Sequence, residues 1–159
     1  MKTRIFIVLN AVIFFAIANF FIFQKEKILK EGDTVILALA PLDPRSLIQG
    51  DYLEIRYAIF SQFKSKNGFS DGYIFVKKDD RGIFQFSKIT DLNGRAEAAE
   101  IKIRFRERSY SVRIGAESYL FQEGEAQKYE KAKYGMLKIS GEGEAMLIAL
   151  LDEKLKLIQ

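Results

Sequence analysis

The chain has 159 residues, which suits one domain with an appendage, and its 25 Lys and Arg against 21 Asp and Glu leave a net charge of +4. It contains no His, Cys or Trp. This composition excludes ordinary zinc sites, haem ligated through His or Cys, thiol redox couples, the Ser-His-Asp triad and Cys proteases. We expect no cofactor and no bound metal, and the mild basic excess gives little reason to expect nucleic acid as a partner.

A long apolar run opens the chain. After a short basic start it extends from Ile5 to Phe23, and only Asn10 and Asn19 interrupt it. About 20 such residues, at 1.5 Å each, cross a bilayer. A buried core helix is the alternative, but a helix that is apolar on every face is typical of a membrane span. The sequence therefore predicts a transmembrane helix and stalk over residues 1–31 and a β-rich domain over 32–159.

The fate and orientation of this helix are less constrained. Ala16-Ile17-Ala18 has the pattern of a signal-peptide cleavage site, so cleavage after Ala18 stays an alternative. The apolar run continues past it through Phe20–Phe23, which favours an uncleaved signal anchor. Lysines and arginines flank both ends, so charge bias alone does not orient the helix. Because the short basic start resembles a secretory signal, we expect a cytoplasmic N-terminus and an extracytoplasmic, periplasmic domain.

The two asparagines in the apolar run carry amides that are costly to expose to lipid. We expect Asn10 and Asn19 to turn towards another helix. They lie nine residues apart, on roughly opposite sides of a helix, so they do not define one narrow contact face.

The rest of the chain alternates short β-capable runs with turn residues. Strands are expected at 34–40, 51–60, 73–77, 83–89, 100–108, 110–114, 136–140, 145–151 and 155–158. The only helix expected in the domain covers residues 122–134, with Gly135 as its cap. This pattern indicates a mostly antiparallel β-sandwich or partly open barrel with one short helix.

Residues 41–57, PLDPRSLIQGDYLEIRY, resemble the membrane-anchored protein family named for its GDYXXLXY motif. Gly50, Asp51, Tyr52 and Tyr57 match the motif, and Ile55 stands in the place of its Leu. Residues 110–124, YSVRIGAESYLFQEG, are similar to the family's second recognisable stretch. The family's function is uncharacterised. Its members look like single-span or signal-bearing proteins that gene context links to polytopic membrane proteins, so the resemblance implies a polytopic membrane partner.

The motif has a structural and a functional interpretation. Gly50-Asp51 after a Pro-containing loop is first a turn, because Gly tolerates positive φ and Asp bonds nearby backbone groups. The functional alternative is a docking loop at one end of the sheet. Its candidate residues are Asp43, Arg45, Gly50, Asp51, Tyr52 and Tyr57.

A second candidate surface is the stripe Lys102, Arg104, Arg106 and Arg108, which alternation places on one face of a strand. Like charges at this spacing repel unless something answers them. The stripe is either solvated or paired with carboxylates, Glu54 among them, or it binds anionic lipid headgroups or an acidic patch on a partner. No nucleic-acid motif accompanies it.

An enzymatic alternative comes from a weaker likeness to the region around the nucleophile of type I signal peptidases. Ser46 would be the nucleophile, and Lys77 or Lys78 a base whose pKa is lowered by burial. The serine follows Pro44, whereas that family has it before the proline. Both lysines also precede an Asp-Asp pair that would keep a lysine charged.

We therefore expect a non-enzymatic, membrane-anchored accessory or assembly subunit whose β-domain binds a polytopic membrane protein or an extracytoplasmic partner. The alternatives are an anchored Ser/Lys-type hydrolase and a periplasmic module that binds an anionic ligand through the arginine stripe. Replacing Ser46 by Ala should abolish function only in the hydrolase.

Overall fold

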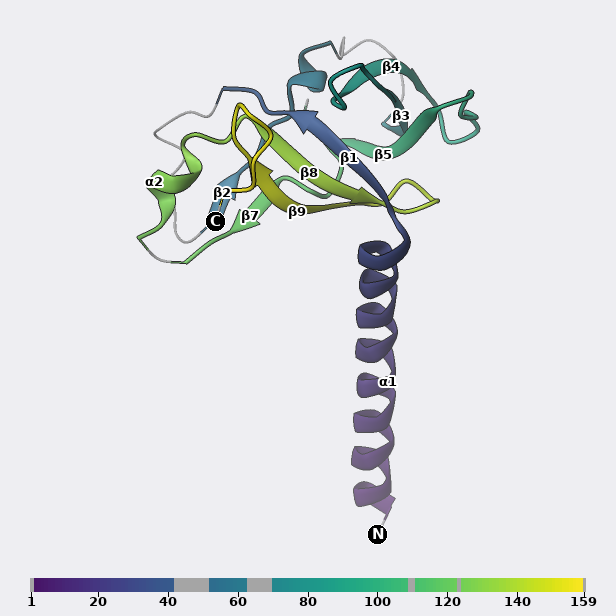
Figure 1. Ribbon diagram of the computed structural model, residues 1–159. Helices are drawn as coiled ribbons and strands as arrows, with labels where there is room; N and C mark the ends of the chain where they lie inside the picture. Colours follow the sequence, from purple (N-terminus) through teal and green to yellow (C-terminus); the bar gives the residue numbers. More distant parts are fainter. Residues whose placement is uncertain (1, 42–51, 63–69, 109–110, 123, 159) are drawn as a thin grey trace. The chain divides into compact units, whose positions relative to one another are not determined.

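The computed structural model describes residues 2–41, 52–62, 70–108, 111–122 and 124–158 (Figure 1). The chain divides into two compact units, residues 1–32 and residues 33–159, each described by itself below.

The first unit is helix α1, Lys2–Glu31. Its stretch from Ile5 to Glu31 is long and apolar enough to cross a membrane. The amide of Asn10 donates to the carbonyl of Phe6 at 2.9 Å, and that of Asn19 donates to Phe15 at 2.8 Å. Each amide thus satisfies one donor within its own helix. The second helix expected to face these asparagines stays a prediction.

The second unit is an antiparallel β-domain, which confirms the predicted fold class. In the described residues its strands form three sheets with the orders β1-β8-β9, β2-β7 and β4-β3-β5-β6 (Figure 1). The strand bounds are β1 Asp33–Ala38, β2 Tyr52–Glu54, β3 Asp71–Lys78, β4 Phe84–Thr90, β5 Glu100–Arg108, β6 Ser111–Arg113, β7 Ser118–Leu120, β8 Tyr134–Ile139 and β9 Ala145–Leu151.

Alternation along the strands builds one hydrophobic core from all three sheets. Leu37 of β1, Leu53 of β2 and Ile103 of β5 are each fully buried in it. The β3–β4 hairpin closes as its Asp/Gly content predicts: the Asp79 carboxylate accepts the N–H groups of Arg81 and Ile83, both at 2.9 Å.

The strand expected over residues 51–60 is wrong in its extent. The described strand β2 ends at Glu54, and a 3₁₀ helix, η2, covers Ala58–Gln62. The alternation itself is correct, since Leu53, Ile55, Tyr57 and Ile59 are all buried. Alternation reports which side chains face the core, and an irregular segment that lies along the core produces the same pattern.

The helix expected over residues 122–134 is also wrong in extent, because α2 covers only Ala126–Tyr129. Four residues beyond its end, the backbone of Lys133 accepts from Leu39 and donates to Leu151, both at 2.9 Å. These contacts draw the chain into β8, which contains Gly135, the expected cap. Sheet pairing overrides helix propensity here. The expected strand at 155–158 is reduced to an isolated bridge between Leu157 and Leu151.

Candidate functional site

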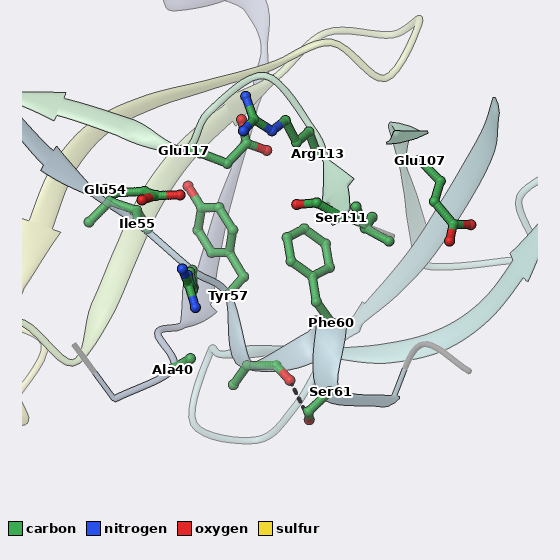
Figure 2. A pocket seen from close by; sticks show the side chains of 13 residues that line it. Ala40, Glu54, Ile55, Tyr57, Phe60, Ser61, Glu107, Ser111, Arg113 and Glu117 are labelled. Atoms are coloured by element: carbon green, nitrogen blue, oxygen red, sulfur yellow. Dashed lines mark hydrogen bonds between the residues drawn. The ribbon is translucent and has the colours of Figure 1, made fainter. Parts of the chain in front are cut away.

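A hollow of about 430 Å³ lies where β2, η2, β6 and the loop before β7 meet (Figure 2). Five charged side chains line it among smaller and apolar ones. The lining residues are Ala40, Glu54, Ile55, Arg56, Tyr57, Ala58, Phe60, Ser61, Glu107, Ser111, Val112, Arg113 and Glu117.

Tyr57, the last residue of the GDYXXLXY-like motif, lines the hollow from a buried position. Its side chain is 1% exposed, and its hydroxyl donates to the carbonyl of Ala116 at 2.5 Å. The ring meets Phe60 edge to face, with centroids 5.8 Å apart. Burial, aided by the charge of Glu117, raises the pKa of Tyr57 well above its ordinary value. Tyr57 is therefore a neutral hydrogen-bond donor.

The same contacts join the two stretches that carry the family resemblance. Strand β2 pairs with β7, and the ladder is extended by a bond from the Ile55 N–H to the Glu117 carbonyl at 2.7 Å. The Glu117 carboxylate accepts the N–H groups of Ile114 and Gly115. Gly115 has φ +82°, which favours glycine. This carboxylate holds the loop that presents the Ala116 carbonyl to Tyr57.

Four other charged side chains at the hollow have no ionic partner among the described residues. Glu54, Arg56, Glu107 and Arg113 form no ion pair with any residue in the described ranges. Figure 2 shows Glu54, Glu107 and Arg113 around the aromatic centre of Tyr57 and Phe60. Arginine binds carboxylates in a bidentate fork, and carboxylates accept from basic groups or N–H donors. The arrangement therefore suits recognition of a polar peptide segment.

The predicted docking loop falls largely outside the described residues. Asp43, Arg45, Gly50 and Asp51 lie there, and Tyr52 is described only as the start of β2. Residues on either side of this segment, Ala40 and Glu54, line the hollow. Tyr57 lies within the described residues, where its hydroxyl donates to the Ala116 carbonyl in the core.

The predicted cationic stripe lies on β5, whose side chains alternate as expected. Arg106 approaches the carboxylate of Asp71 at 3.5 Å, and the Lys102 ammonium lies 5.0 Å from the ring centre of Tyr73. Glu54, one of the carboxylates considered as a partner of the stripe, makes no ion pair with the described residues. Asp71 takes the role because strand pairing places it opposite Arg106. Arg108 is exposed, and Arg104 is half-buried.

The structure gives the hydrolase alternative no support. Ser46 lies outside the described residues, while Lys77 and Lys78, at the end of β3, both have exposed side chains. The hypothesis requires a buried lysine, and neither lysine is buried. Within the described ranges, no three Asp or Glu side chains are grouped so as to hold a metal ion.

Sequence reasoning missed Arg56, Glu107 and Arg113 as members of a site. Arg56 lies inside the motif, and Arg113 lies in the second family-like stretch. Their proximity depends on the β2–β7 and β5–β6 pairings. The weak signal in the sequence is the charge of Arg56 and Arg113 within two stretches that both resemble one family, whereas Glu107 lies outside both stretches.

The chain is a β-domain protein with an N-terminal helix long and apolar enough to span a membrane. The chain belongs to the GDYXXLXY protein family, whose sequence model matches residues 14–150. The match covers the second half of the apolar helix and nearly all of the β-domain, and it confirms the resemblance found in the sequence. No curated protein and no solved structure matches the chain.

Proposed function

We propose that this protein is a non-enzymatic accessory or assembly subunit, anchored by α1 with its β-domain outside the cytoplasm. The hollow beside Tyr57 binds a polar segment of a polytopic membrane protein or of a neighbouring extracytoplasmic protein. The observation that carries the proposal is the set of four charges at the hollow that pair with nothing in the described chain. The length and apolar character of α1 support the anchoring.

The mixed signs of these charges indicate the kind of partner. Three carboxylates and two guanidinium groups line the hollow, so it offers no net attraction to a small anion. A peptide segment that carries both acidic and basic groups is more complementary to these charges than a small anion is. Charge complementarity of this kind sets specificity and association rate more than raw affinity. The bonds of Tyr57 and Glu117 connect the two chain segments that carry Arg56 and Arg113.

Affinity purification of the tagged full-length protein from native membranes in mild detergent tests the proposal. The test variant is Arg56→Glu with Glu107→Lys, which reverses two hollow charges and preserves net charge. The control is Lys131→Glu with Glu153→Lys, the same exchange at two exposed positions that do not line the hollow. We expect a stoichiometric membrane protein with the wild type and the control, and its loss with the test variant.

Two results would overturn the proposal: no stoichiometric partner with the wild type, or a partner that the hollow variant retains in full. A Ser46→Ala arm separates the hydrolase alternative. If this change abolishes function while the purified complex stays intact, catalysis by Ser46 replaces docking as the explanation.

A further inference from the structure

The four-stranded sheet has a strongly basic outer face, formed by Lys102, Arg104, Arg106 and Arg108 of β5 together with Arg113 of β6. Strand pairing places Arg106 directly opposite Arg113. Two like charges at this cross-strand spacing destabilise a sheet unless an anion lies near them. We call these five residues the basic face; Arg113 lies at its border, because it also lines the hollow.

The described chain neutralises little of this charge. One carboxylate, that of Asp71, forms an ion pair with the basic face, at 3.5 Å from Arg106, and both side chains are about half-exposed. The Nε atom of Arg104 is buried and has no hydrogen-bond partner in the described residues. On the same sheet, by contrast, Lys88 is bound by both Glu97 and Glu100. The basic face therefore keeps an excess of positive charge.

The surroundings of the basic face favour lipid headgroups. Tyr73 lies opposite Arg104 in the sheet, and the Lys102 ammonium sits over its ring. Aromatic rings beside basic side chains are typical of surfaces that meet the membrane interface. One residue, Gly32, separates the end of α1 from β1. The polar stalk over residues 24–31 adds only about 12 Å at 1.5 Å per residue, so a domain on an inserted helix stays near the headgroups.

We propose that the basic face binds the phosphate groups of anionic phospholipids in the membrane that holds α1. Phosphate accepts bidentate hydrogen bonds from arginine, which matches a face that has four arginines and one lysine. This contact restrains the β-domain against the bilayer and limits the orientations in which the hollow meets a partner.

Full-length protein in lipid nanodiscs tests the proposal, and the absence of native cysteine allows labelling at one chosen position. A fluorophore on Ser111→Cys reports on the basic face, because Ser111 is exposed and lies opposite Arg108. A fluorophore on Glu130→Cys, exposed near α2, is the control. All discs contain a small share of lipid that is spin-labelled at the headgroup and quenches the fluorophore. Neutral discs are otherwise pure phosphatidylcholine, and anionic discs contain about 30% phosphatidylglycerol.

We expect quenching at Ser111 to be at least about twofold stronger in the anionic discs, with no such increase at Glu130. The increase should disappear in about 1 M salt, where the Debye length is about 3 Å. It should also disappear in Lys102→Gln with Arg108→Gln, but not in Lys131→Gln with Lys154→Gln, which removes the same charge elsewhere. Near-ultraviolet circular dichroism of the tyrosines checks that each variant is folded.

Equal quenching at Ser111 in neutral and anionic discs would overturn the proposal, as would an equal rise at Glu130. If lipid composition has no effect on the Ser111 label, the lipid assignment is wrong, even where a protein shields that label, because Ser111 also lines the hollow. If all variants unfold, the salt comparison on the wild-type background still decides the outcome.

Discussion

The hydroxyl of Tyr57 should contribute measurably to the free energy of unfolding of the β-domain. Tyr57→Phe removes only that oxygen, which donates to the Ala116 carbonyl at 2.5 Å inside the core. The ring is 1% exposed and Ala116 is 4% exposed, so water does not readily replace the lost partner. A buried acceptor left without its donor costs about 1–3 kcal/mol, and we expect a loss in the free energy of unfolding of that size.

The measurement is urea unfolding of the full-length protein in micelles, followed by tyrosine near-ultraviolet circular dichroism. All 7 tyrosines lie outside α1, so the signal reports on the β-domain alone. Tyr134→Phe is the matched control, because Tyr134 is half-buried and its hydroxyl makes no hydrogen bond with the described residues. A loss below about 0.5 kcal/mol for Tyr57→Phe, or an equal loss in the control, would refute the structural role of the motif tyrosine.

Tyr57→Phe should also change how the free energy of unfolding depends on pH in the alkaline range. Tyr57 has a higher pKa in the folded domain than in the unfolded chain, where tyrosine titrates near pH 10. Above about pH 10 the unfolded chain releases a proton that the folded domain retains, so stability falls as pH rises, by up to about 1.4 kcal/mol per pH unit. Tyr57→Phe should show a flatter decline there, and parallel curves would contradict the assignment.

Three further predictions concern the turn before β9, an acid-sensitive carboxylate and the orientation of the chain. Gly143→Ala should lower the free energy of unfolding by about 1–3 kcal/mol in urea titrations, because Gly143 has φ +89° and an added Cβ would lie 3.0 Å from a backbone nitrogen of β5. Gly141→Ala, with nothing within 4 Å, should change little, and equal effects would contradict this reasoning. The Ser87 hydroxyl, the Glu97 N–H and the Lys88 ammonium lower the pKa of Glu100 to about 2, so its stabilisation is complete above the unfolded value of 4.5 and is lost as pH falls towards 2. Glu100→Gln should flatten the acid dependence of stability, whereas the exposed Glu142→Gln should not. A single cysteine at exposed Lys154 should react with a membrane-impermeant maleimide in right-side-out vesicles, and labelling only in inside-out vesicles would reverse the proposed orientation.

The fold class could be predicted because the local signals agree with the tertiary structure. The alternation in residues 100–108 and the Asp/Gly turn after Lys78 are local patterns that need no distant partner to be recognised. Both appear as expected, in β5 and in the β3–β4 hairpin. The extent of α2 could not be predicted, since the chain that follows it is bonded elsewhere: the backbone of Lys133 accepts from Leu39 and donates to Leu151. Those partners are distant in sequence, and local propensity contains no information about them.

The candidate site shows the same division. The motif points to Tyr57, but its buried position and its bond to Ala116, 59 residues away, depend on the β2–β7 pairing. Arg56 and Glu107 are unremarkable charges in the sequence and become a site only where the two segments meet. The sequence offers Glu54 as one possible partner of the stripe, whereas the register along β3 brings Asp71 to Arg106.

The proposed docking role is tested most directly by site-specific photo-crosslinking in native membranes. A photoreactive amino acid replaces Ser61, an exposed residue that lines the hollow, and in a parallel protein it replaces exposed Lys154. The account predicts one discrete product from Ser61 that contains a polytopic membrane protein or a single extracytoplasmic partner. That product should be absent from Lys154 and from the Arg56→Glu, Glu107→Lys background. No discrete product from Ser61, or the same product from both positions, would contradict the account.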